Sequence, residues 1–370
     1  MGSLKVCICG GGALGHVISA TMASHDDYQV QLLTGHPDLW EKEISISIPG
    51  EKAVTGRLTR ISSDAREVIA DVDYVILCLP GYLIDPTLRK IAPFLKKGVV
   101  VGSVVSSNGF FWMARSILPK ENPFFGLQRV PYIARVIEYG HCAELKGYKN
   151  ELKVAVSENG DKEVIRKIVE TFFGTTTVLL KSFLAAALTN SNPLLHTARL
   201  YMLFKDYSPG TLYKEAPLFY EDWDEESSKL LIACDDEFQQ ILGRLPLGGE
   251  EIPPVLTHYD SIDSKSLTCK LRSIKPFKDI RLDMLRTMDG FAPDWQNRYF
   301  TEDIPYGLLI VKSFAVFFAI QTPSIDKILY WAQERMGKEY LIGGSLSGRD
   351  MADTGVPDNY VSSIGELLEV

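Results

Sequence analysis

The first half of the chain alternates short apolar runs with segments of helical periodicity. An apolar run over residues 4–9 precedes a glycine turn, a helical segment over about 13–24 and a second apolar run over 29–33. This order predicts a βαβ unit. We expect further strands at 73–80, 99–105, 152–156 and 176–180, with helices at 84–95 and 162–173. Such alternation predicts an α/β domain with a mainly parallel sheet over residues 1–181.

From residue 182 onward the apolar residues recur at helical spacing and few segments alternate like strands. Helices are expected at 183–204, 225–242, 306–319 and 325–336, with turns at 208–210 and 247–249. The aromatic and proline-rich segment 207–223 and the glycine-rich segment 343–355 are interpreted as loops. The pattern therefore predicts a second, mostly helical domain over residues 182–370.

Composition narrows the class of protein. Apolar residues make up 46% of the chain and charged residues 23%, as in ordinary folded proteins. The net charge of -8 argues against a broad surface for nucleic acid or anionic membrane. The chain has neither a signal-like start nor an apolar run of about 20 residues, so we expect a cytoplasmic protein. No metal site is expected, because the cysteines are scattered without a CxxC pair: Cys7, Cys9, Cys78, Cys142, Cys234 and Cys269.

The glycine turn carries the first candidate chemistry. Gly10, Gly12 and Gly15 fit the GxGxxG pattern, and they lie between a buried strand and a helix, as a dinucleotide-binding loop requires. Backbone N–H groups at the start of that helix, around Ala13 and Leu14, are expected to face a pyrophosphate. We therefore predict that this loop binds NAD or NADP.

The end of the second strand bears on the choice of cofactor. An acidic residue there accepts hydrogen bonds from the ribose of NAD, but this chain has Thr34, Gly35 and His36. The absence of the carboxylate favours NADP slightly, whereas Asp38 just beyond could still serve NAD. A later strand end is also expected to line the cofactor crevice, through Cys78, Leu79 and Pro80.

Candidate catalytic residues occur in the helical half. Asn192 and His196 are four residues apart and so share a helix face. A single histidine on an apolar helix is more often a packing residue than a catalyst. Arg298 and Asp303 precede an apolar helix, where acidic residues stabilise the helix dipole without any catalytic role. Taken alone, these residues favour the structural interpretation.

Five motifs are spread over the chain. They are GGGALG at 10–15, FGLQ at 125–128 with Pro131, Tyr132 and Gly140 beyond, NPLLHTARLY at 192–201, DDE at 235–237 and RYFTEDIPYGL at 298–308. Together they resemble one family, the opine dehydrogenases of the octopine and nopaline types, and the resemblance spans nearly the whole chain. It implies a Rossmann domain followed by an all-helical domain of the 6-phosphogluconate dehydrogenase C-terminal kind.

The resemblance also implies roles for individual residues. His196 is the expected acid/base catalyst, Asp303 its partner, and Arg298 the ligand for a substrate carboxylate. Asn192 and Gln128 are weaker candidates for substrate contacts, and Arg135 is more consistent with surface or interdomain packing. The implied reaction condenses an amino acid with a 2-oxo acid to an imine, which NAD(P)H reduces.

Two other functions stay open at this point. A dehydrogenase with the same plan could reduce the carbonyl of a 2-hydroxy or 3-hydroxy acid pair, or of a ketopantoate-like substrate, without any amine. Alternatively, the chain could be a nucleotide-binding sensor without catalytic activity, which predicts cofactor binding without turnover. A homodimer is compatible with the sequence, and no nucleic-acid or membrane partner is expected.

Overall fold

The computed structural model describes residues 3–247 and 252–369 and divides into two compact units. The first unit comprises Met1–Ala187 together with Tyr360–Val370, and the second comprises Leu188–Asn359. The boundary therefore lies after residue 187, where the sequence predicted 181, and the last eleven residues belong to the first unit. They are held there because the buried Trp112 indole N–H donates to the Leu367 carbonyl at 3.1 Å.

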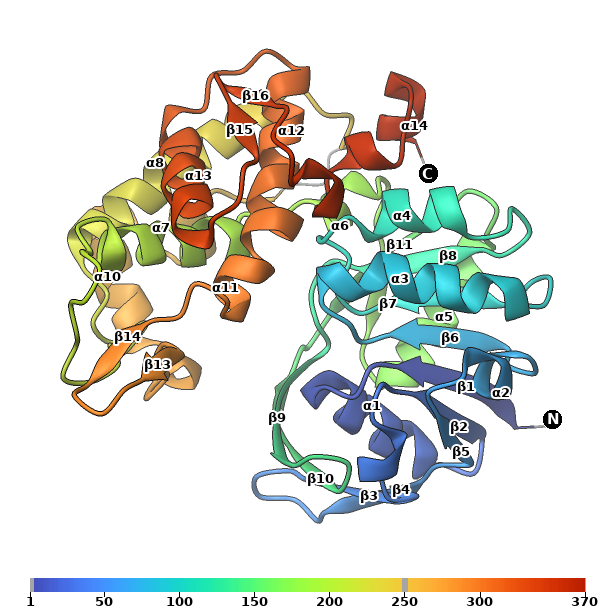
Figure 1. Cartoon of the computed structure of the whole chain (residues 1–370). Helices are drawn as coiled ribbons and strands as arrows, with labels where there is room; N and C mark the ends of the chain where they lie inside the picture. Colours follow the sequence, from blue (N-terminus) through green and yellow to red (C-terminus); the bar gives the residue numbers. More distant parts are fainter. Residues whose placement is uncertain (1–2, 248–251, 370) are drawn as a thin grey trace. The chain divides into compact units, whose positions relative to one another are not determined.

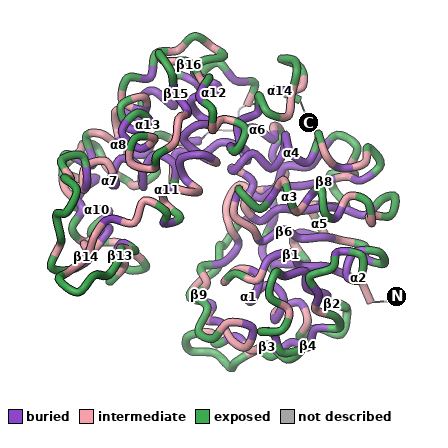
Figure 2. Tube along the Cα trace, viewed as in Figure 1, coloured by how far each residue is buried: buried purple, intermediate pink, exposed green. Residues whose placement is uncertain are grey.

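An eight-stranded sheet forms the centre of the first unit (Figure 1). All neighbouring strands pair in parallel except β11, which is antiparallel to β8. Its central strands are buried on both faces, as their continuous apolar runs predict (Figure 2). In spatial order the strands are β12 (Thr177–Leu179), β11 (Leu152–Val156), β8 (Phe124–Leu127), β7 (Val100–Ser103), β6 (Tyr74–Leu77), β1 (Leu4–Cys9), β2 (Tyr28–Leu33) and β5 (Arg60–Ser62).

Helices cover both faces of this sheet. Helices α1 and α5 contribute to one apolar core with strands β1, β2 and β6, while on the opposite face α3 contacts both α2 and α4 (Figure 1). Helix α5 has the predicted bounds because Asp161 caps its first turn and Gly174 ends it at φ 59°. The helices are α1 (Ala13–Ala23), α2 (Ala65–Ile69), α3 (Gly81–Ile91), α4 (Phe110–Ile117), α5 (Lys162–Phe173), α6 (Leu184–Ala187) and α14 (Ile364–Leu368).

A four-stranded sheet, which the sequence did not predict, packs against helix α1. Its order is β4 (Val54–Arg57), β3 (Glu43–Ser47), β10 (Cys142–Tyr148) and β9 (Tyr132–Glu138). A Cβ atom on Gly56 of β4 would lie 2.2 Å from the Ala20 carbonyl of α1, so glycine permits this close packing. The sheet covers the outer side of the helix that begins at the glycine loop.

The second unit is mainly helical, as predicted, and its described residues also form two short two-stranded ribbons. The predicted helix over 183–204 is broken into α6 and α7, because Pro193 occupies the first turn of α7 and cannot continue a preceding helix. Its elements are α7 (Asn192–Phe204), α8 (Glu225–Leu242), α9 (Val255–His258), α10 (Ser264–Ser273), β13 (Met284–Arg286), β14 (Phe291–Pro293), α11 (Arg298–Thr301), α12 (Leu309–Phe317), α13 (Pro323–Met336), β15 (Leu341–Ile342) and β16 (Ser345–Leu346).

Loop predictions have mixed outcomes. Backbone hydrogen bonding from Thr211 to Ser208 closes the predicted turn at 208–210. The predicted turn at 247–249 extends into residues 248–251, which lie outside the described residues. Within the glycine-rich segment, Gly343 and Gly344 have φ of 57° and 85° and form the turn between β15 and β16. Among residues 3–247 and 252–369, no helix is long and apolar enough to cross a membrane.

Candidate active site and cofactor loop

The glycine loop has three positions with different steric demands. Gly10 adopts φ 119°, and a Cβ atom there would lie 2.5 Å from the Cys78 carbonyl oxygen. A Cβ atom on Gly15 would lie 1.9 Å from the Gly10 carbonyl oxygen, so the close packing of helix on strand requires glycine. Gly12 has nothing within 4 Å of its Cβ position. Two glycines thus serve the turn and the packing, and Gly12 leaves open space for a ligand.

The start of helix α1 suits an anion. Gly12 is the N-cap and supplies no side-chain hydrogen bond, and the first turn around Ala13 and Leu14 carries no acidic residue. The backbone N–H groups and the positive end of the helix dipole are therefore suited to phosphate oxygens. These residues fit the pyrophosphate of a dinucleotide.

The strand end at Cys78, Leu79 and Pro80 lies against the same loop. A Cβ atom on Gly10 would also lie 2.9 Å from Leu79 Cδ2, and Pro80 is the N-cap of α3. Burial raises the pKa of the Cys78 thiol, so this side chain stays protonated and acts as a small apolar group. Its position is consistent with a wall of the cofactor site.

Tyr139, which was not among the residues predicted from the sequence, lies at the end of β2. The predicted residue Thr34 is buried there, and its hydroxyl accepts from the His36 backbone N–H at 3.4 Å and lies 3.4 Å from the Tyr139 hydroxyl. Asp38 lies in a short 3-10 helix, Pro37–Leu39, and lines a pocket of about 510 Å³. Two more carboxylates, Glu41 and Glu138, line that pocket.

A second unanticipated residue, His16, joins the phosphate loop to the four-stranded sheet. Its Nδ1–H donates to the Gly12 carbonyl at 2.9 Å, and its Nε2 accepts the Gly140 N–H at 2.8 Å. The ring also packs on Trp40, with centroids 4.2 Å apart. Burial lowers the pKa of His16, so the neutral ring that makes both hydrogen bonds is favoured.

The second unit brings His196 and Asp303 together across 107 residues of sequence. The His196 Nδ1 atom lies 2.7 Å from Asp303 Oδ2, and both residues are buried, with 6% and 7% of their surfaces exposed. Helix α7 carries the imidazole, while Asp303 follows α11 and precedes Pro305. As a carboxylate, Asp303 accepts the Nδ1–H and leaves Nε2 as the nitrogen that can take up a proton.

Tyr220, absent from the sequence-based candidates, lies at that nitrogen. Its hydroxyl is 3.0 Å from His196 Nε2, and the tyrosine is 5% exposed. Tyr299 adds a ring contact to His196, with centroids 4.4 Å apart. Tyr220 lies in the segment that the sequence predicted only as a loop, and no local pattern indicated its contact with helix α7.

The other predicted residues differ in their surroundings. Arg298 is exposed, lies five residues before Asp303 and begins α11, whose first turn is capped by Asn297. Asn192 is exposed at the start of α7. In the first unit, Gln128 donates its side-chain N–H to the Ala185 carbonyl at 2.8 Å, so this amide supports the backbone. Arg135 is an exposed residue of β9.

The DDE motif at 235–237 has a structural role in the second unit. Asp235 accepts from the Asn190 side chain and the Val255 backbone, each at 2.8 Å. Burial raises the pKa of Asp235, opposed by these hydrogen bonds. Glu237 accepts from Ser324 and Ile325 N–H groups and so caps α13. Within the described residues, no cluster of three or more His, Cys, Asp or Glu side chains could hold a metal ion.

Comparison with known proteins gives consistent matches over both units. Residues 179–336 match the family described as the alpha-helical domain of NAD/NADP octopine/nopaline dehydrogenase, and residues 6–126 match ketopantoate reductase PanE/ApbA. The octopine dehydrogenase of Mizuhopecten yessoensis is 31% identical over 97% of this chain and 96% of its own.

Two solved structures of octopine dehydrogenase are also similar over nearly the whole chain. One, with NADH and L-arginine, has a TM-score of 0.83 at 28% identity and covers 97% of this chain and 96% of its own. The other, with NADH and pyruvate, has a TM-score of 0.82 at 28% identity, with 97% of this chain and 95% of its own covered.

Proposed function

The chain belongs to the opine dehydrogenase family of the octopine and nopaline type, and from this premise we propose that it joins an amino acid to a 2-oxo acid by reductive condensation. It is an NAD(P)-dependent oxidoreductase of the type that acts on CH–NH bonds. The observation that carries the proposal is the buried pair of His196 and Asp303, whose side chains lie 2.7 Å apart.

His196 and Asp303 transfer protons in the proposed reaction. An amino acid arrives as an ammonium ion and must lose a proton before its nitrogen attacks the 2-oxo carbon. His196 takes that proton at Nε2, and Asp303 stabilises the imidazolium through Nδ1–H. The addition product then loses its hydroxyl group as water after His196 returns the proton, so the C=N bond forms and the histidine is neutral again. Acid–base catalysis of this kind contributes about 10²–10⁴ in rate.

Arg298 is the proposed ligand for a substrate carboxylate. Its guanidinium has the planar pair of donors that bind a carboxylate through two hydrogen bonds. It is exposed at the start of α11, only five residues from Asp303. A carboxylate held there orients the 2-oxo carbon with respect to the imidazole. Asn192, one helical turn before His196, is a further proposed substrate contact.

The cofactor loop belongs to the first unit. We propose that Gly10, Gly12, Ala13, Leu14 and Gly15 hold the pyrophosphate. The remaining proposed cofactor contacts are Thr34, His36, Cys78, Leu79 and Pro80. When bound, the nicotinamide supplies the hydride that reduces the C=N carbon to a secondary amine.

Reduction of a carbonyl without an amine is the second candidate function. The match to ketopantoate reductase over residues 6–126 favours it only weakly, because those residues contain the cofactor loop and neither His196 nor Asp303. The assay that separates the two follows NADH and NADPH oxidation with pyruvate or 2-oxoglutarate, with and without a panel of amino acids. Oxidation that requires the amine supports the proposal, and amine-independent oxidation supports the hydroxy-acid alternative. Cofactor binding without any turnover would indicate the sensor.

A further inference from the structure

Both ring nitrogens of His196 are already engaged within the second unit. Nδ1 lies 2.7 Å from Asp303 Oδ2, and Nε2 lies 3.0 Å from the Tyr220 hydroxyl. Because the carboxylate accepts the Nδ1–H, the neutral ring has a lone pair on Nε2, and the Tyr220 O–H donates to it. The nitrogen assigned to proton exchange therefore faces a hydroxyl group instead of open space.

The aromatic ring of Tyr220 is firmly packed. It stacks on Phe277 with centroids 4.0 Å apart and planes 17° from parallel, and it contacts Phe219 edge-on at 4.9 Å. Trp223 lies nearly parallel to it at 6.4 Å. Rotating the ring away from His196 would break this stack, so the hydroxyl is expected to stay at Nε2 during turnover.

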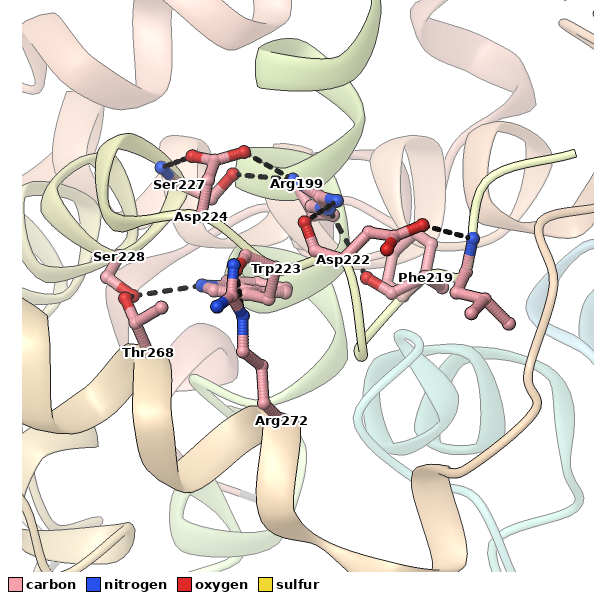
Figure 3. A network of polar contacts seen from close by, with 10 residues as sticks. Arg199, Phe219, Asp222, Trp223, Asp224, Ser227, Ser228, Thr268 and Arg272 are labelled. Carbon is pink, nitrogen blue, oxygen red and sulfur yellow. Dashed lines mark hydrogen bonds and ion pairs between the residues drawn. The ribbon is translucent and has the colours of Figure 1, made fainter.

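The backbone around Tyr220 is held by Arg199, which lies on the same helix as His196. Arg199 is 1% exposed, and it donates to the Phe219 carbonyl at 3.2 Å and to the Asp222 carbonyl at 2.5 Å (Figure 3). Its guanidinium also pairs with Asp224 at 2.5 Å. These contacts lie on both sides of Tyr220. Helix α7 thus fixes the imidazole and, one turn later, the loop that carries the hydroxyl.

The surroundings of the Tyr220 hydroxyl keep its proton in place. Burial is the main cause that raises the pKa of this phenol, and Tyr299, Tyr259 and Asp303 raise it further. Arg298 acts in the opposite direction, but the pKa remains raised. The phenol therefore stays protonated at neutral pH, and its O–H is available to donate to His196 Nε2, 3.0 Å away.

We propose that Tyr220 is the proton relay of this site, passing protons between His196 Nε2 and the reacting substrate atoms. The inference rests on the proposed function. When the substrate ammonium loses its proton, that proton goes to the Tyr220 oxygen while the Tyr220 O–H proton goes to Nε2. In the later step the imidazolium Nε2–H returns a proton to the oxygen, and the O–H proton goes to the leaving hydroxyl, which departs as water. Tyr220 is neutral before and after each transfer, so no phenolate accumulates.

The test removes the hydroxyl and keeps the ring. Tyr220→Phe should lower kcat by about 100-fold or more, toward the value of His196→Ala, with the KM values and the NADH Kd within about twofold of wild type. Because both groups act on one proton path, the double variant should be no slower than His196→Ala. Tyr201→Phe is the matched control, since Tyr201 lies on the same helix and packs on Trp331.

Two results would overturn the relay. One is a Tyr220→Phe enzyme with kcat within about threefold of wild type; the other is a double variant whose losses multiply. Nitrogen-15 NMR of His196 gives a readout independent of activity: Tyr220→Phe should move the Nε2 resonance and leave Nδ1 almost unchanged, and an unmoved Nε2 resonance contradicts the contact itself. Wild type and Tyr220→Phe are compared with any carbonyl substrate that the wild type reduces, whether or not an amine is needed. If turnover does not require an amine, that result refutes only the proposed function, and the test of the relay still applies.

Discussion

Replacing Asp303 by asparagine tests the dyad with a change of a single group. The His196–Asp303 hydrogen bond is 2.7 Å long and buried, so water does not replace the lost carboxylate. A hydrogen bond to a charged partner contributes about 1.5–3 kcal/mol. If that stabilisation of the imidazolium is lost, kcat falls about 10- to 150-fold, since 1.36 kcal/mol is a tenfold change.

A second effect adds to this loss. The asparagine amide can donate to Nδ1 and so move the ring proton to Nε2, the nitrogen that must accept a proton. In a serine protease a comparable substitution lowers kcat by about 10⁴ through the wrong tautomer. We therefore expect Asp303→Asn to lower kcat by about 10²–10⁴, with little change in NADH affinity.

The assay is steady-state NADH oxidation with saturating amine and 2-oxo acid, together with NADH titration by fluorescence. Asp206→Asn is the control, because it removes the same charge from an exposed residue just beyond helix α7. If Asp303→Asn keeps kcat within twofold of wild type, the reasoning is refuted. A fall in activity that parallels a loss of NADH binding would equally point away from the dyad.

Three further predictions concern the cofactor loop and the substrate carboxylate. The added Cβ of Gly12→Ala contacts no atom of the chain, so this variant should fold normally but raise the NADH Kd about tenfold or more. The added Cβ of Gly15→Ala would lie 1.9 Å from a carbonyl oxygen, so this variant should lower the melting temperature of the first unit. Calorimetry distinguishes the two effects. Burial lowers the pKa of His16 below 6.5, so its contribution to stability is present above that pH and is lost as the pH falls toward the pKa of the folded state. His16→Gln should therefore reduce the decrease in melting temperature between about pH 7.5 and 5.5. An unchanged dependence of melting temperature on pH would contradict this prediction. Arg298→Ala should raise the KM for the 2-oxo acid about 10- to 100-fold, with a smaller change in the KM for the amino acid. Initial-rate kinetics with each substrate varied in turn measures both values. A larger change in the KM for the amino acid would contradict the assignment of Arg298.

The elements predicted well from the sequence are those whose signals are local. Strand β1 and helices α5 and α8 have the predicted bounds, because apolar runs, N-caps such as Asp161 and Asp224, and the end-point Gly174 all lie within the elements themselves. The four-stranded sheet was missed because β9 is largely exposed and β4 has a glycine in its centre, so neither has the apolar pattern of a buried strand.

The same distinction between local and tertiary signals applies to the residues of the site. The glycine loop was predictable because its spacing and context are local, and His196, Asp303 and Arg298 entered through a family resemblance that spans the chain. Tyr220 could not be predicted, because its position depends on Arg199, and the hydrogen bonds from this arginine to Phe219 and Asp222 span 20 and 23 residues. The available signal was an arginine one turn after the candidate histidine on an apolar helix. The sequence does not show which segment this arginine binds, because its partners are distant along the chain.

Deuterium transfer tests the central claim most directly. Wild-type enzyme is supplied with NADH deuterated at the transferable position, a 2-oxo acid and an amino acid, and the products are identified by mass spectrometry beside those of His196→Ala. We predict a secondary amine dicarboxylate with one deuterium on the former 2-oxo carbon, formed by wild type and lost in His196→Ala. A deuterated 2-hydroxy acid as the product, or full activity of His196→Ala, would contradict the account.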